Sequence, residues 1–91
     1  MLHNFYKTRT IYYISEHIAD RRLSLLKDLV AYTNDPVRYK RRFRILVQLA
    51  NYEKNILEKI ENFITDQQSD IDIDMLDYLK LEVDAIVNLN S

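Results

Sequence analysis

Between residues 8 and 33, apolar side chains recur at steps of three, four and seven residues, which is the spacing of an α-helix. A first stripe consists of Ile11, Ile14, Ile18, Leu25, Leu29 and Tyr32. A second stripe consists of Tyr12, Ala19, Leu23, Leu26 and Val30. At about 100° per residue, the two stripes give the predicted helix a wide apolar arc. A helix of this kind is expected to contact more than one neighbour.

The longest predicted helix covers residues 36 to 66, which contain no Gly and a single Pro at the first position. Asp35 can cap this helix by accepting a hydrogen bond from a free backbone N–H, and Pro36 is favourable at a position that needs no N–H. One apolar stripe consists of Tyr39, Phe43, Leu46, Ala50, Leu57, Ile60 and Ile64. The other consists of Ile45, Leu49, Tyr52, Ile56 and Phe63. The stripes together span about half of the circumference, so at least two neighbouring helices are expected.

A third helix is predicted over residues 73 to 90, after a loop at residues 67 to 70. Because only Asn34 and Asp35 separate the first two helices, these must run antiparallel as a hairpin. Residues that face each other across the hairpin should then have numbers that sum to about 69. The sequence therefore predicts an all-α fold with a single domain over residues 1–91. This fold is a three-helix, up-down-up bundle built on a long antiparallel hairpin, with helices at about 8–33, 36–66 and 73–90 and a shorter third helix.

The unequal lengths of these helices predict apolar side chains that the rest of the chain does not cover. The third helix is too short to reach the closed end of the hairpin, and it is itself apolar on two opposite sides, of which only one can face the core. The candidate contact residues are Leu23, Leu26, Val30 and Ile45 on the hairpin and Tyr78, Leu81 and Leu89 on the third helix. Scattered apolar residues are normal on a protein surface, but grouped exposure is typical of an interface. We therefore expect a homo-oligomer or another protein partner.

Charge is distributed unevenly along the chain, although the net charge is only −1. Residues 1–44 hold ten Lys or Arg and four Asp or Glu (+6), whereas residues 45–91 hold three and ten (−7). The densest cluster lies at the start of the second helix, and its candidate contact residues are Arg38, Lys40, Arg41 and Arg44. Such a cluster indicates an acidic protein surface or nucleic acid as the partner, or a solvated face with no specific role. Tyr39 and Phe43 lie on a core stripe, so we expect them to pack inside rather than to stack on bases.

Three charged residues, Arg22, Arg42 and Glu53, fall inside apolar arcs. Buried charges are costly unless they are paired. The facing rule places Asp28 near Arg41 and Arg42, and Glu53 is within an arginine side chain's reach of Arg22. These residues are expected to form ion pairs, or alternatively to line the anion pocket of an enzyme.

Several kinds of site are excluded or disfavoured by residue types. The chain has no Gly, which excludes glycine-rich phosphate loops, and no Cys, which excludes disulfides and cysteine-based metal sites. The run from Asp70 to Asp74 has the opening of a calcium loop, but Met75 stands where the turn needs Gly and Leu81 where a Glu ligand is needed. His17 lacks a neighbouring metal ligand and is expected on the surface. We expect no metal, cofactor or catalytic residue.

No apolar run has the length of a membrane span, about 20 residues, and the first residues lack the apolar core of a signal peptide. A cytoplasmic protein is therefore expected. A composition rich in Ile, Asn, Tyr and Asp suits an AT-rich genome, such as that of a virus or mobile element, in which case the location is the host cell.

These observations favour a non-enzymatic helical module for protein–protein interaction or assembly, self-associating, with a basic hairpin tip for an acidic partner. A small nucleic-acid-binding protein that uses the same tip is the first alternative. An enzyme acting on a small anionic substrate through Arg22, Arg42 and Glu53 is the second. No small-molecule substrate is expected under the favoured interpretation.

Overall fold

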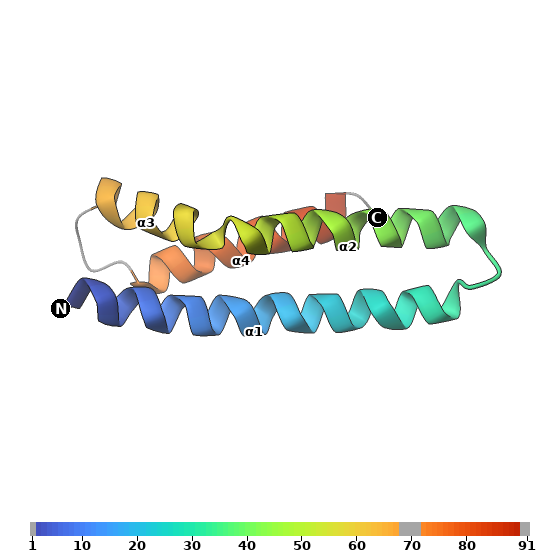
Figure 1. Cartoon of the computed structure of the whole chain (residues 1–91), viewed down its shortest axis with the longest axis horizontal. Helices are drawn as coiled ribbons and strands as arrows, with labels where there is room; N and C mark the ends of the chain where they lie inside the picture. The colour runs from blue at the N-terminus through green and yellow to red at the C-terminus, as the bar shows by residue number, and fades with distance from the viewer. Residues whose placement is uncertain (1, 68–71, 90–91) are drawn as a thin grey trace.

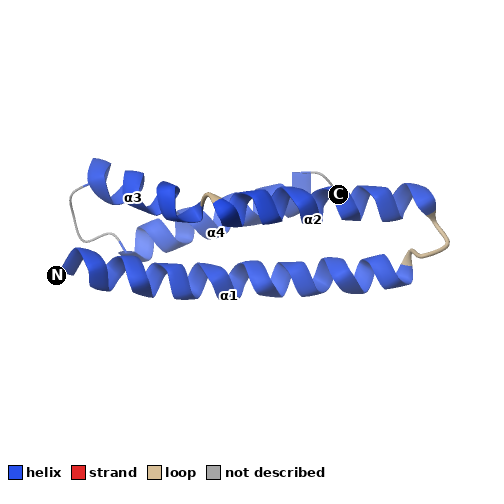
Figure 2. Cartoon of the chain, viewed as in Figure 1, coloured by secondary structure: helices blue, strands red, loops and turns tan. Residues whose placement is uncertain are grey.

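The structure, a computed structural model, describes residues 2–67 and 72–89, with side chains described for residues 7–63 and 75–88. This part of the chain is helical apart from short turns (Figure 2). Its helices are α1 (Leu2–Ala31), α2 (Pro36–Lys54), α3 (Ile56–Gln67) and α4 (Asp72–Leu89). They form an elongated body of 51 × 18 × 18 Å. The all-α prediction is confirmed, and α1 begins several residues earlier than expected.

The hairpin between α1 and α2 forms as predicted, with the two helices antiparallel and side by side (Figure 1). The Asp35 carboxylate accepts a hydrogen bond from the Arg38 N–H at 3.2 Å, and Pro36 occupies the first turn of α2. At the end of α1, the Thr33 hydroxyl donates to the Val30 carbonyl at 2.8 Å. The turn therefore satisfies backbone groups at both helix ends with its own side chains.

The predicted single helix over residues 36 to 66 is instead two helices, with a break at Asn55. Asn55 has φ −98° and ψ 4°, outside the helical region, and its N–H donates to the Tyr52 carbonyl at 3.1 Å. Its side-chain amide donates to the Asn51 carbonyl at 3.0 Å. Asn side chains compete with the backbone for such bonds, which explains the local break. The three-helix topology is thus replaced by four helices, because α2 and α3 together occupy the place of one.

The core lies where α4 packs against both arms of the hairpin. The end of α4 lies beside the middle of α2, so the closed end of the hairpin extends beyond it (Figure 1). The buried core residues are Ile14, Ile18, Leu25, Ile45, Leu49, Tyr52, Ile56, Ile60, Met75, Leu79 and Val83. Ile45 has an exposed fraction of 0%. The expectation that Ile45 is an uncovered contact residue is therefore wrong, because its stripe on α2 faces α1 and α4.

Ion pairs attach α4 to the hairpin on the sides of this core. Asp84 of α4 accepts hydrogen bonds from Arg21 Nε at 2.9 Å and pairs with His17 Nε2 at 2.9 Å. Lys59 of α3 lies 3.5 Å from the Glu82 carboxylate. The expected surface position of His17 is wrong, since its side chain is only 15% exposed. Burial opposes ionisation of Asp84, but the bonds from Arg21 and His17 outweigh it and lower the pKa of this carboxyl.

Candidate interaction surface

Nine large apolar side chains of α1 and α2 are exposed among the described residues, and six of them form a group near the closed end of the hairpin. On α1 the exposed fractions are 54% for Leu23, 43% for Leu26 and 78% for Val30. On α2 they are 38% for Tyr39, 51% for Phe43 and 45% for Val47. We call these six residues the hairpin surface. The exposure expected for Leu23, Leu26 and Val30 is confirmed, whereas the expected packing of Tyr39 and Phe43 inside the core is wrong.

The two halves of the hairpin surface lie next to each other. The Arg42 side chain donates from Nε to Asp28 Oδ2 at 3.0 Å, so facing residues have numbers that sum to about 70, as expected for a tight hairpin. In this register Val30 lies beside Tyr39 and Leu26 beside Phe43. The exposed apolar groups of α1 and α2 therefore lie at the same levels along the hairpin.

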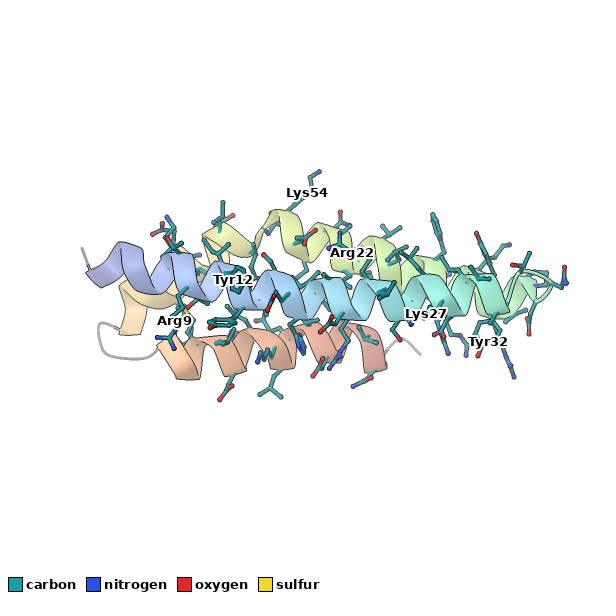
Figure 3. All side chains as sticks on the ribbon, turned by 90° about the horizontal axis from the view of Figure 1, so that it is seen from below. Arg9, Tyr12, Arg22, Lys27, Tyr32 and Lys54 are labelled. Atoms are coloured by element: carbon teal, nitrogen blue, oxygen red, sulfur yellow. The ribbon has the colours of Figure 1, made fainter. Side chains whose placement is uncertain are left out.

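Figure 3 indicates which side of the molecule this surface occupies. Arg22 and Lys54 lie on the side of the hairpin away from α4 (Figure 3). Leu26 follows Arg22 by one helical turn and Val47 precedes Lys54 by two turns, so both belong to the same side. The hairpin surface is thus opposite α4, and α4 covers none of it.

A hollow of about 460 Å³ lies on the α2 half of this surface. It is lined by Tyr39, Lys40, Phe43, Arg44 and Val47. Three of these side chains are apolar or aromatic, and the other two carry positive charge. The hollow is therefore suited to apolar side chains that are accompanied by acidic groups.

The four predicted basic residues, Arg38, Lys40, Arg41 and Arg44, are all exposed near the start of α2, and we call them the basic tip. Arg38 lies 3.5 Å from the Asp35 carboxylate, and its guanidinium lies 5.3 Å from the Tyr32 ring centre. Cations disfavour the N-terminal end of a helix, where the helix dipole is positive. Helix stability therefore does not explain why so many cations are placed there.

The outward side of α4 is a second exposed apolar region. Tyr78 is 49% exposed and Leu81 is 69% exposed, as expected from the sequence. The Tyr78 ring lies 5.6 Å from the Phe63 ring of α3, so part of this side is covered by a neighbouring aromatic residue. The side chain of Leu89, the third predicted contact on α4, lies outside the described residues.

The three charged residues considered for catalysis do not converge. Arg22 donates to Glu53 at 3.3 Å, whereas Arg42 donates to Asp28. Glu53 and Arg42 are eleven positions apart along α2, about 16 Å at the rise of an α-helix. The hollow beside Arg22 and Glu53 measures only about 100 Å³. These residues form the two ion pairs that the sequence predicted between the helices.

Sequence reasoning missed a cluster around Tyr52, which is 7% exposed. The Lys59 ammonium lies 5.4 Å from the Tyr52 ring centre and also near Glu82. The Tyr52 hydroxyl has no hydrogen bond of ordinary length among the described residues. Burial first, and the nearby Glu82 carboxylate second, raise the pKa of Tyr52 far above its ordinary value. An aromatic residue within an apolar stripe gives no signal of such neighbours.

The structure places no metal-binding cluster of His, Asp or Glu among the residues it describes. The side chains of the acidic run from Asp70 to Asp74 lie outside the described residues. Within the described segments, no helix is both long enough and apolar enough to cross a membrane.

No protein-family model, curated protein or solved structure matches this chain. Its function is therefore inferred from its own residues.

Proposed function

We propose that this protein is a non-enzymatic helical interaction module. The hairpin surface binds an apolar stripe on a helix of the partner, and the basic tip contacts acidic residues that flank this stripe. The observation that carries the proposal is the exposure of six large apolar side chains, between 38% and 78%, on adjoining helices opposite α4. An amphipathic helix laid into such a surface is a common mode of recognition.

Burial of the hairpin surface provides the driving force. Full burial of a large apolar side chain contributes about 1.5–3 kcal/mol, and these six side chains, which are 38–78% exposed, can each contribute part of that amount. Apolar side chains that are exposed as a group are typical of an interaction site. The basic tip adds selectivity, because cations next to an apolar surface favour partners with acidic flanks and accelerate their encounter. The open, shallow hollow of about 460 Å³ exposes Tyr39, Phe43 and Val47 to apolar side chains of the partner.

Fluorescence anisotropy with labelled designed helices tests this proposal. One helix carries a leucine stripe flanked by Glu, and a control helix carries the same stripe flanked by Lys. We expect the Glu-flanked helix to bind at least tenfold more tightly at low salt, with the difference decreasing as salt is added. Equal affinity for the two helices, or no binding of either to the chain at a concentration where it is monomeric, would contradict the proposal.

Matched variants locate the binding site. Leu26→Asp places a charge in the hairpin surface, whereas Leu81→Asp places the same charge on the outward side of α4, and both original side chains are exposed. We expect Leu26→Asp to weaken binding of the Glu-flanked helix at least tenfold and Leu81→Asp to leave it unchanged. The reverse result would assign binding to α4.

A second candidate function, binding of single-stranded nucleic acid, is favoured by one specific observation. Tyr39 and Phe43 are exposed next to Lys40 and Arg44, and aromatic rings beside cations can stack on bases while the cations contact phosphates. An electrophoretic retardation assay with single-stranded RNA or DNA at increasing salt separates the candidates. Binding that falls steeply with salt and is reduced by Phe43→Ala would support nucleic acid.

A further inference from the structure

The exposed apolar stripe extends beyond the hairpin surface along the whole hairpin. On α1 it continues from Leu23 through Ala19 to Tyr12, which is 58% exposed. Beyond α2 it continues to Leu57 of α3, which is 51% exposed. Tyr12 and Leu57 have numbers that sum to 69, so the facing rule places them beside each other at the far end. The stripe is therefore a long apolar strip rather than a patch at one end.

The charges that flank this strip differ between its two ends, because exposed acidic residues occur only away from the hairpin tip. Near the hairpin tip the flanking exposed residues are basic: Lys27 on α1 and Lys40 and Arg44 on α2. Toward the far end the exposed flanking residues include the acidic Glu16 on α1 and Glu58 on α3, together with the basic Arg9 and Lys54, and Asp20 lies near the middle of the strip. A surface with this arrangement is complementary to itself when one copy is turned end to end.

We propose that the partner of the hairpin surface is a second copy of this chain, bound antiparallel so that each basic tip lies at the acidic end of the other copy. This inference rests on the proposed function and names its partner. Four of the five apolar strip positions of α1, residues 12, 19, 23 and 30, are symmetric about residue 21, whereas the fifth, Leu26, has Glu16 at its mirror position. A twofold axis near that position places α1 against α1 of the second copy, with Tyr12 beside Val30 and Ala19 beside Leu23.

The same axis brings opposite charges together. Glu16 of one copy lies opposite Lys27 of the other, and Glu58 lies opposite Lys40. Lys54 lies opposite Phe43 of the other copy, an arrangement in which an ammonium group can lie over an aromatic ring. The alternative symmetric arrangement, with both tips at one end, would bring together the basic tips of both copies, and like charges at that distance disfavour it.

The size of the surface fits a stable dimer. The long face of the molecule measures 51 by 18 Å. This face has a projected area of about 900 Å² per copy, so contact over most of it is needed to reach the roughly 800 Å² per partner that stable interfaces bury. The resulting dimer consists of two hairpins stacked face to face, with the two α4 helices on the outside.

Light scattering and cysteine cross-linking of the full chain test the inference. At low salt and rising concentration, we expect the mass to reach twice 11.0 kDa. The chain has no Cys, so Tyr12→Cys and Val30→Cys each introduce a single thiol at an exposed position. On oxidation of an equimolar mixture in which one variant carries a mass tag, we expect a disulfide-linked heterodimer. A mixture of Val30→Cys with Tyr39→Cys tests the arrangement with tips together, and there we expect no heterodimer.

Charge exchange provides a second measurement that does not depend on thiols. Glu16→Lys with Glu58→Lys should weaken dimerisation at least tenfold at low salt. Adding Lys27→Glu and Lys40→Glu to the same chain should restore it, because each opposite pair is then re-formed with signs exchanged. Failure of the exchanged chain to recover, with its helical circular dichroism intact, would overturn the antiparallel register.

The outcomes separate this inference from the function on which it rests. A chain that stays monomeric at high concentration overturns the inference, but if it binds the Glu-flanked helix the proposed function stands. A monomer that binds neither helix overturns both. A dimer that cross-links through Val30→Cys and Tyr39→Cys keeps the assembly function and overturns the antiparallel arrangement.

Discussion

Arg42 Nε lies 3.0 Å from Asp28 Oδ2 and joins α2 to α1 close to the closed end of the hairpin. Figure 3 shows the preceding residue, Lys27, beyond the end of α4. The Arg42 side chain is 20% exposed and that of Asp28 is 40% exposed, so the pair is partly shielded from water. It therefore connects α1 and α2 in a region that α4 does not reach.

A double-mutant cycle measures the contribution of this pair. Because Asp28 is substantially exposed, solvent screens the interaction, and we expect a coupling of about 0.5–1 kcal/mol in the free energy of unfolding. Arg42→Met, Asp28→Asn and the double variant are compared by urea denaturation. Arg44→Met, an exposed position one half-turn away, is the control for loss of charge. Strictly additive effects would show that the ion pair contributes nothing.

The orientation of α4 is tested by two leucines that lie two positions apart. Leu79 is 0% exposed and Leu81 is 69% exposed. Truncation of a fully buried leucine leaves a cavity, so we expect Leu79→Ala to lower the free energy of unfolding by about 2–5 kcal/mol. Leu81→Ala should change it by no more than about 0.5 kcal/mol. Similar effects of the two changes, in urea denaturation of dilute protein, would mean that α4 packs in another orientation.

Asp84 gives the fold a predictable response to acid. Its pKa is lowered in the folded chain, so its contribution to stability is present above the ordinary value of 3.8 and is lost as the pH falls through the folded pKa. We expect Asp84→Asn to remove part of the acid-induced loss of stability between pH 5 and pH 2, at the expense of stability near neutral pH. Asp77→Asn, an exposed position on the same helix, is the control.

The measurement for Asp84 is the urea midpoint as a function of pH. If the wild type and Asp84→Asn lose stability in parallel throughout the acid range, the bonds from Arg21 and His17 do not act as described.

Tyr52 makes the stability of the fold decrease at alkaline pH. Its pKa is raised in the folded chain, so stability is fully present below 10.0, the ordinary tyrosine value, and decreases as the pH rises above it. In a tyrosinate absorbance titration of the folded protein, we expect Tyr52 to ionise only when the chain unfolds. Of the seven tyrosines, the one that ionises only on unfolding should be missing from the titration of Tyr52→Phe. This variant should also lose less stability at alkaline pH.

This titration has an internal control. In urea, where the chain is unfolded, Tyr52→Phe should show one tyrosine fewer than the wild type ionising near the ordinary pKa. If Tyr52→Phe removes amplitude from the early phase of the folded protein instead, the hydroxyl is accessible to water.

Helical period alone was sufficient to predict much of the fold. The stripes on α1 and α4 separate clearly into a buried and an exposed set, as with Ile14 and Leu23 or with Leu79 and Leu81. The hairpin was predictable because its turn is short and Asp35 and Pro36 are strong start signals. The facing rule also places Asp28 near Arg41 and Arg42, and the structure pairs it with Arg42.

For the second predicted helix, the sequence pattern does not determine which side is buried. Both of its stripes are apolar, and the sequence does not say which one the neighbouring helices cover. Ile45 is buried and Phe43 is exposed because α1 and α4 approach the side of α2 that carries Ile45. The break at Asn55 depends on one side-chain bond to the Asn51 carbonyl, which a periodic pattern does not reveal. The pairing of His17 with Asp84 required knowledge of how α4 is placed along α1.

Because α4 is short, the free-energy cost of local unfolding should decrease along the hairpin toward its closed end. Amides of α1 near His17 are held by helices on two sides, whereas amides near the closed end have only one neighbouring helix and open at a lower free-energy cost. In hydrogen exchange, protection should therefore decline along α1 from its middle toward Ala31. If another polypeptide covers the opposite face, protection should return to that end first, and its recovery reports occupancy residue by residue.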